Sequence, residues 1–171
     1  MTKILEAAAS AAMPEAAAFR DAMAEVASAA HLVTTTGLSG RAGLTATAVA
    51  SVSDAPPTLL ACLEAGSRTL AAIEASGFFC VNTLSALDHE LAAVFSGRAG
   101  LSGEARFARG EWTRLVTGAP VLKSALVAFD CRLVAAHAVA THKVLIGEVV
   151  ALGGSGVGES LVYRRRRFGG F

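Results

Sequence analysis

The sequence predicts a mainly β protein, a β-barrel with peripheral helices, rather than a doubly wound α/β sheet. Segments with strand patterns outnumber those with helical spacing, and they lack the regular alternation of strand and helix that a parallel sheet requires. The 171-residue chain is 53% hydrophobic, which is enough apolar material for one core. The expected strands are residues 31–36, 44–53, 58–63, 78–83, 125–138, 141–152 and 161–163.

Three segments are expected to be helices: residues 15–29, residues 68–76 and a segment that begins at Ser85. The first has apolar residues at helical spacing, and the second has Ser67 as its N-cap and Gly77 at its end. The third starts with the spacing of a capping box. The apolar residues expected on the helix faces are Phe19, Met23 and Val26 in the first helix, and Leu87, Leu91, Val94 and Phe95 in the third.

The segment from Leu44 to Ser53 alternates between two kinds of side chain, as in one strand with two different faces. A glycine-rich turn, Gly37–Gly43, precedes it, and Pro56-Pro57 ends it. One face carries small hydroxyl side chains, which leave room for a flat ligand to lie against the backbone and hydrogen-bond its amides. The hydroxyl residues are Thr45, Thr47, Ser51 and Ser53.

The run Ser67-Arg68-Thr69 opens the second expected helix and has the composition of a phosphate site. It offers two hydroxyls, a cation and helix amides without intrahelical acceptors. A ring site and a phosphate site together describe a nucleotide-like cofactor. Hydroxyl-rich strands and serine caps are also common in proteins that bind no ligand, so these residues alone leave the question open.

Composition argues against nucleic acid and membrane partners. Fifteen basic and fourteen acidic residues give a net charge of +1, which provides no overall attraction to nucleic acid or anionic lipid. The longest apolar stretch, residues 122–152, is interrupted by seven charged or histidine residues and therefore reads as strands. Residues 1–13 lack the strongly apolar centre of a secretory signal. We expect a flexible leader over residues 1–13, a single domain over residues 14–171 and a cytoplasmic location.

Neither the cysteines nor the histidines have the spacing of a metal site. Cys62, Cys80 and Cys131 stand singly in apolar stretches, which favours buried reduced thiols over a disulfide or a zinc site. His137 and His142 are expected on opposite faces if their strand is continuous, although a turn between them would alter this.

The glycine-rich segment Gly153–Ser160 looks like a phosphate-binding loop at first sight. Glu159 stands where that motif requires a lysine, and an acid there reverses the sign of the charge that a phosphate needs. Only residues 161–171 follow, too few for the supporting helix and strand. We expect a hairpin turn.

The run from Gly40 to Ser53, followed by Pro56-Pro57, resembles the short-chain flavin reductase family. Members of this family supply reduced flavin to two-component monooxygenases. The resemblance covers about residues 19–168, in order, and its strength lies in the combination of segments. The further matching segments are Ser67-Arg68-Thr69, Phe79–Leu84, Arg106-Phe107, Trp112, Phe129–Cys131, Thr141-His142 and Leu161–Tyr163.

The resemblance implies a split β-barrel flavin-binding fold, antiparallel and Greek-key-like, and a homodimer with flavin sites near the subunit interface. It implies FMN or FAD as flavin and NADH or NADPH as electron donor. His142 matches a histidine beside the nicotinamide, although Thr141 replaces a frequent aspartate before it, and Phe168 replaces a frequent tyrosine. The residues carried over as flavin contacts are Thr45, Ala46, Thr47, Ala48, Ser51, Val52, Ser53, Cys62, Leu63, Ser67, Thr69 and Arg165.

The expected function is therefore NAD(P)H-dependent reduction of free or bound flavin, with a flavin-dependent monooxygenase as partner. Hydride would pass directly between the two cofactors, so no side chain is expected to act as acid or base. Two other classes stay open: a flavin-binding or haem-handling split barrel without reductase turnover, and an interaction module that binds no flavin. Arg164–Arg167 is expected to be a solvated tail, with dinucleotide phosphate binding or oxygenase docking as alternatives.

Overall fold

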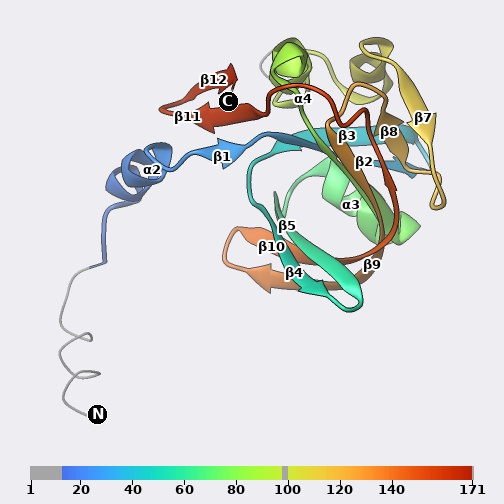
Figure 1. Cartoon of the computed structure of the whole chain (residues 1–171). Coiled ribbons are helices and arrows are strands. Elements are labelled where there is room, and N and C mark those ends of the chain that lie inside the picture. The colour runs from blue at the N-terminus through green and yellow to red at the C-terminus, as the bar shows by residue number, and fades with distance from the viewer. Residues whose placement is uncertain (1–12, 98–99, 171) are drawn as a thin grey trace.

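The computed structural model describes residues 13–97 and 100–170, and its main body is a curved sheet of seven strands (Figure 1). Of the predicted leader, residues 1–12 lie outside the described residues, and Met13 is exposed. The seven strands are β2 (His31–Gly37), β3 (Gly40–Ala46), β4 (Val49–Asp54), β5 (Pro57–Glu64), β6 (Phe78–Thr83), β9 (Val127–Val139) and β10 (His142–Gly153).

The strand order is β3-β2-β6-β9-β10-β5-β4, and every neighbouring pair is antiparallel. The two edge strands, β3 and β4, follow each other in sequence and are joined only by Thr47 and Ala48. This short connection brings the edges together, and the Cys62 amide at the end of β5 donates to the Ala48 carbonyl at 2.9 Å. The predicted mainly β, antiparallel fold with peripheral helices is confirmed.

The prediction of one strand from Leu44 to Ser53 is wrong, because the chain bends at Thr47-Ala48. β3 pairs with β2, whereas β4 pairs with β5 at the other edge of the sheet. An alternating pattern records which face each side chain occupies but not which neighbour the strand pairs with, so it cannot show this change of partner. The predicted Gly37–Gly43 turn is likewise shorter, and only Leu38 and Ser39 form it.

Helix α3 (Arg68–Ser76) has the predicted bounds and packs on β2 and β3. The Ser67 hydroxyl accepts hydrogen bonds from the amides of Thr69 and Leu70. The helix ends at Gly77, whose φ of 76° is the left-handed conformation that favours glycine. Local capping residues therefore determine both ends of this helix.

The third helical segment begins with the predicted capping box at Ser85 and Asp88, as the short helix η1 (Ala86–Asp88) followed by α4 (His89–Phe95). Leu91 and Phe95 are buried as expected, but Leu87 is 91% exposed. Leu87 lies in the tighter 3₁₀ turn, where the α-helical spacing used to predict the face does not apply.

The segment after α4 contains the helix η2 (Gly103–Ala108) and the hairpin β7 (Trp112–Arg114) and β8 (Pro120–Leu122). Phe107 and Trp112 anchor it as predicted, with their rings 4.9 Å apart and both packed against Phe95.

The barrel core is densely packed around Phe79, which is fully buried with Ile73, Val81 and Leu145. A Cβ at Gly147 on β10 would lie only 2.5 Å from the Cζ atom of Phe79. Glycine at this strand position therefore lets the aromatic ring approach the backbone.

The two ends of the described chain form a separate small unit, which we call the terminal module (Figure 1). It contains α2 (Ala16–Ala24) and a three-stranded sheet of β1 (Ser28–Ala29), β11 (Leu161–Arg164) and β12 (Arg167–Gly170). The predicted helix over residues 15–29 thus ends early, because residues 28–29 pair with β11. Arg164–Arg167 is not a tail: it is the β11–β12 hairpin, with Arg165 and Arg166 at its turn.

The segment Gly153–Ser160 is not a hairpin turn either, because β10 and β11 belong to different sheets. It crosses from the barrel to the terminal module, and the Ser155 and Gly156 amides donate to the carbonyls of Ala125 and Leu126. Within residues 13–97 and 100–170, no helix is long and apolar enough to cross a membrane.

Candidate functional site

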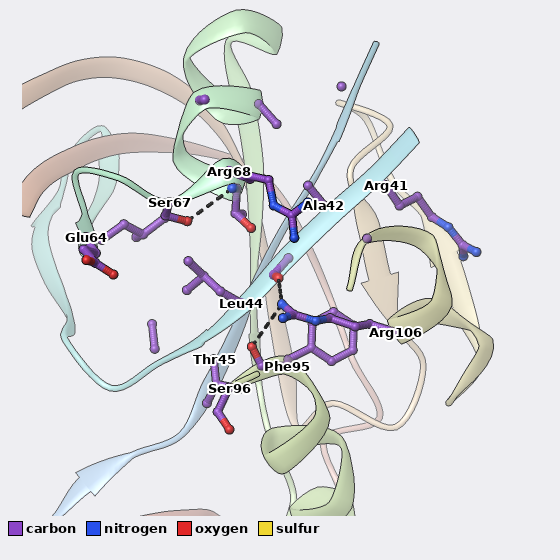
Figure 2. Close-up of a pocket in the computed structure, with 18 of the residues that line it drawn as sticks. Arg41, Ala42, Leu44, Thr45, Glu64, Ser67, Arg68, Phe95, Ser96 and Arg106 are labelled. Atoms are coloured by element: carbon purple, nitrogen blue, oxygen red, sulfur yellow. Dashed lines mark hydrogen bonds between the residues drawn. The ribbon is translucent and has the colours of Figure 1, made fainter. Parts of the chain in front are cut away.

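An open cleft of about 960 Å³ lies between β3, the start of α3 and the loops that follow α4 (Figure 2). This volume is within the range of small-molecule and cofactor sites. The cleft gathers nine of the thirteen residues predicted from the sequence: Thr45, Ala46, Thr47, Ala48, Cys62, Leu63, Ser67, Thr69 and His142.

The bend at Thr47-Ala48 forms one part of the cleft wall. Thr47 makes no hydrogen bond to any described residue, so its amide and hydroxyl are open to a ligand. The hydroxyl of Thr45, in contrast, donates to the Ala92 carbonyl at 2.7 Å and ties β3 to α4. Thr47 is therefore available to hydrogen-bond a ligand, whereas the hydroxyl of Thr45 is already used in a hydrogen bond within the protein.

The start of α3 differs in one respect from the sequence expectation. The amides of Thr69 and Leu70 are not free, because the Ser67 oxygen accepts from them at 3.2 and 3.5 Å. Ser67 is half-buried and Thr69 buried, and both line the cleft. An anion at this position would therefore depend on hydroxyl and guanidinium donors more than on these helix amides.

His142 lies at the start of β10, where it is exposed to the cleft. Its Nδ1 atom is 2.9 Å from the hydroxyl oxygen of Thr141. Thr141 thus provides a hydrogen-bonding partner for the ring, at the position where the resemblance implies an aspartate. Across the sheet, His142 is paired in register with Glu64 of β5, which also lines the cleft.

His137 and His142 lie on the same face of the β9–β10 hairpin, not on opposite faces. His137 is the cross-strand partner of Val144, and Val144 and His142 are two residues apart on β10. The chain reverses at Ala140-Thr141, so the two histidines do not belong to one continuous strand, in which residues five apart would face opposite sides. No cluster of three potential metal-ligating side chains occurs in the part of the chain that the structure describes.

Four predicted contacts lie outside the cleft. Ser51, Val52 and Ser53 are exposed on β4, and the two serines line a second, apolar groove of about 560 Å³. Arg165 lies in the terminal module, where its Nε atom donates to the Glu25 carboxylate at 2.9 Å. This hydrogen bond is the main reason why the pKa of Glu25 lies below its usual value.

The cysteines are free thiols, as predicted. Cys62 is half-buried beside the cleft, whereas Cys80 and Cys131 are buried in the barrel. Burial raises the pKa of Cys131 to about 12 and also raises that of Cys80, so both thiols stay protonated at neutral pH. They are inert packing groups.

Sequence reasoning gave no ligand role to Arg106, which the structure places on the cleft opposite α3 (Figure 2). Its guanidinium donates to three backbone carbonyls: Leu101 at 2.8 Å, Gly43 at 3.1 Å and Phe95 at 3.4 Å. Burial, together with the nearby charge of Arg68, lowers the pKa of Arg106. The Arg106-Phe107 match within the family resemblance was the only sequence signal for this residue.

The fold and the cleft together define a split-barrel protein with an open, arginine-lined cleft of the size that small-molecule and cofactor sites have. Comparison with known families matches residues 23–171 to the flavin reductase like domain, and the chain belongs to that family.

A curated relative, FMN reductase (NADH) RutF 1 of Methylorubrum extorquens, is 52% identical over 160 residues, which cover 93% of this chain and 79% of that protein. The crystal structure of ycdh, a candidate flavin reductase of Haemophilus somnus 129pt, has a TM-score of 0.88 at 42% identity and covers 92% of this chain and 100% of that one. BorF, the flavin reductase component of a bacterial two-component tryptophan halogenase, has a TM-score of 0.84 at 28% identity, with coverage of 91% and 98%.

Proposed function

We propose that the protein is an NADH-dependent FMN reductase that supplies reduced flavin to a partner monooxygenase. The observation that carries this proposal is the cleft itself, where open backbone at Thr47, the imidazole of His142 and three arginines line one continuous space. The relative named FMN reductase (NADH) supports the choice of flavin and electron donor, and BorF supports the role of a reductase component.

The cleft residues fit a flavin by size and by chemistry. A planar ring needs small side chains, which the segment Thr45–Ala48 provides, and open backbone, which Thr47 provides at the bend between β3 and β4. The other end of the ligand carries a phosphate, and Ser67, Thr69 and the cleft arginines are its donors. Cys62 and Leu63 line the wall between these two ends.

The protein's part in the reaction is to position the two reactants and exclude water between them. When bound, the flavin supplies the atom that accepts hydride. His142 borders the space where the nicotinamide would lie, and its Nδ1 atom is engaged by Thr141, which fixes the ring for contacts through Nε2. No proton transfer by a side chain is required for hydride transfer, so His142 is a positioning residue.

The predicted homodimer is part of this proposal, and α2 supports it. None of its residues is buried, and Phe19, Met23 and Val26 at and just beyond the helix are 60%, 49% and 50% exposed. An apolar face of this kind is typical of a surface that another chain covers. We also propose residues 14–171 as a single domain and the cytoplasm as its location, in keeping with the free thiols.

The decisive experiment measures NADH and NADPH oxidation by the purified protein with FMN, with FAD and without flavin. We expect oxidation that depends on flavin and is fastest with NADH and FMN. A protein that binds FMN but oxidises neither nucleotide would instead be a flavin-binding split barrel without turnover, and one that binds no flavin would be an interaction module.

The role of His142 is tested separately with His142→Ala. We expect a higher KM for NADH and an unchanged dissociation constant for FMN, because the imidazole faces the nicotinamide end of the cleft. Thr141→Val should show the same effect more weakly, since it removes only the hydroxyl that holds the ring. Unchanged NADH kinetics in His142→Ala would remove this residue from the mechanism.

A further inference from the structure

One carboxylate is found among the described residues that line the cleft, that of Glu64 at the end of β5. Its side chain is exposed and makes no hydrogen bond or ion pair with any described residue. Glu74 and Glu104, each next in sequence to a cleft-lining residue, differ because they pair with Lys143 and Arg41. Glu64 therefore presents an uncompensated negative charge to a ligand in the cleft.

Glu64 and His142 lie opposite each other on neighbouring strands. They are register partners in the β5–β10 pair, so their side chains point to the same face of the sheet. Hydrogen bonds fix the backbone here, because the Ala65 amide donates to the Thr141 carbonyl and the Ser67 amide to the Glu64 carbonyl, each at 3.0 Å. The carboxylate and the imidazole thus share the end of the cleft where the proposed function places the nicotinamide.

The cationic side chains of the cleft lie away from Glu64. Figure 2 shows Arg41, Arg68 and Arg106 together on one side of the view, with Glu64 apart from them beyond Ser67. The cleft therefore has a positive end and a negative end. An anionic group of a ligand is stabilised at the first end, and a group that becomes positive during a reaction is stabilised at the second.

Hydride transfer from NADH to a flavin separates charge. The C4–H bond of the neutral dihydronicotinamide breaks, and its two electrons leave with the hydrogen to form an N5–H bond on the flavin. The nicotinamide is oxidised to a pyridinium cation, and the reduced flavin carries the balancing negative charge. A fixed carboxylate beside the nicotinamide interacts more strongly with the cation than with the neutral ring, so it lowers the barrier to hydride transfer.

We propose that Glu64 stabilises the positive charge that develops on the nicotinamide during hydride transfer. This role rests on the proposed function and adds an electrostatic group to the positioning residue His142. Because the backbone of Glu64 is fixed and its side chain has no described partner to release, its charge is in place before the reaction begins. The cleft is open to water, so we expect a contribution of about fivefold to the rate.

The test separates binding from the hydride step in the wild-type protein and in Glu64→Gln, which keeps the size of the side chain and removes its charge. Protein loaded with FMN is mixed with NADH in the absence of oxygen, and the rate of flavin reduction is measured at saturating NADH. We expect this rate to fall about fivefold in the variant. A primary isotope effect with NADH deuterated at C4 identifies hydride transfer as the step observed. Competition binding should show that the variant holds NAD⁺ about fivefold more weakly and NADH almost as tightly as the wild type.

Glu148→Gln is the matched control, because Glu148 lies on β10 outside the cleft and pairs with Arg132. It removes the same charge and should change neither the rate nor NAD⁺ binding. Glu64→Asp keeps the charge and should retain most of the rate. The difference between the wild type and Glu64→Gln should also shrink as ionic strength rises, since salt screens exposed charges. Equal weakening of NAD⁺ and NADH in Glu64→Gln, with an unchanged rate at saturation, would make Glu64 a hydrogen-bond partner only and overturn the proposal.

The outcomes separate the role of Glu64 from the proposed function. A wild-type protein that reduces FMN with NADH, and that Glu64→Gln equals in rate and in NAD⁺ binding, would retain the reductase assignment and overturn the role of Glu64. A wild-type protein that oxidises no NADH, but whose Glu64→Gln variant selectively loses affinity for NAD⁺, would lose the reductase assignment. Glu64 would then remain the group that recognises the nicotinamide cation. A protein that binds neither nucleotide would overturn both.

Discussion

The barrel and the terminal module are held together by different forces. In the barrel, β-strand pairing and buried residues such as Phe79 and Leu145 fix the structure, and the polar groups of the cleft stand on that rigid base. In the terminal module, α2 buries no residue, and Arg164, Arg165 and Arg166 pair with the carboxylates of Glu25 and Asp21. Leu161 of β11 is buried with barrel residues such as Leu84, so it is α2 that relies on exposed ion pairs, which stabilise less than burial does.

The largest expected effect is in the barrel core. Phe79→Ala removes a fully buried ring and should lower the free energy of unfolding by about 3–5 kcal/mol. Phe19→Ala removes the same side chain from exposed α2 and should cost less than about 0.5 kcal/mol in the isolated chain. Urea unfolding at low protein concentration measures both. A comparable loss in the two variants would show that α2 is as well packed as the barrel.

Acid should weaken the barrel through His31 on β2. Burial lowers the pKa of His31 to about 4, from about 6.5 in the unfolded chain, so between these values only the unfolded chain takes up the proton. The free energy of unfolding should therefore fall as pH drops through this window, by on the order of 3 kcal/mol.

Unfolding curves at several pH values test this effect. In His31→Asn, which keeps a polar group near the Thr83 hydroxyl, the loss between pH 6.5 and pH 4 should be smaller. An equally steep loss in that variant would assign the acid sensitivity to other groups.

The cap of α3 links barrel stability to ligand binding. Ser67→Ala removes the acceptor of two helix amides and should cost about 1 kcal/mol of stability. Ser67→Asp keeps an acceptor at the cap but places a negative charge beside the proposed phosphate position. We expect near-normal stability with weaker FMN binding and little change for riboflavin. Equal weakening of both flavins would place the phosphate elsewhere.

The smallest effect is expected for the ion pairs of the terminal module. Arg165→Gln should leave the thermal midpoint unchanged within error, since both Arg165 and its partner Glu25 are exposed to solvent. Amide exchange in α2 should nevertheless become faster. The pKa of Glu25 is lowered by Arg165, so this contribution is present above the usual carboxylate pKa and is lost as pH falls through the lowered value. Exchange that stays slow in the variant would mean that other contacts hold α2.

Sequence patterns predicted well those features that neighbouring residues determine. Ser67 and Gly77 set the ends of α3, and the Ser85 capping box starts the third helix. Features that depend on distant partners were missed. Nothing local shows that the chain changes partner strand at Thr47-Ala48, or that residues 28–29 leave a helical pattern to pair with β11.

The candidate site shows the same limit. The residues on β3 and at the start of α3 were predictable because each run is contiguous and chemically distinctive. Arg106 was given no role because it stands alone in an irregular segment, and only the folded chain brings it across from Arg68. Ser51 and Ser53 were predicted beside Thr45 by extending one strand through the bend, and the bend carries them to a different groove.

The bend itself has a consequence for how this fold can be re-engineered. Thr47 and Ala48 are the whole connection between the two edge strands and also part of the cleft wall. An inserted residue there would shift the contact between the edge strands β3 and β4 and, at the same time, the part of the cleft wall that the bend forms. The exposed hairpin tip at Leu38-Ser39 borders the same cleft but joins β2 and β3, which pair with each other. Its length can therefore change without displacing the edge strands β3 and β4 relative to each other. Libraries that aim to alter ligand choice should therefore vary the tip and leave the bend intact.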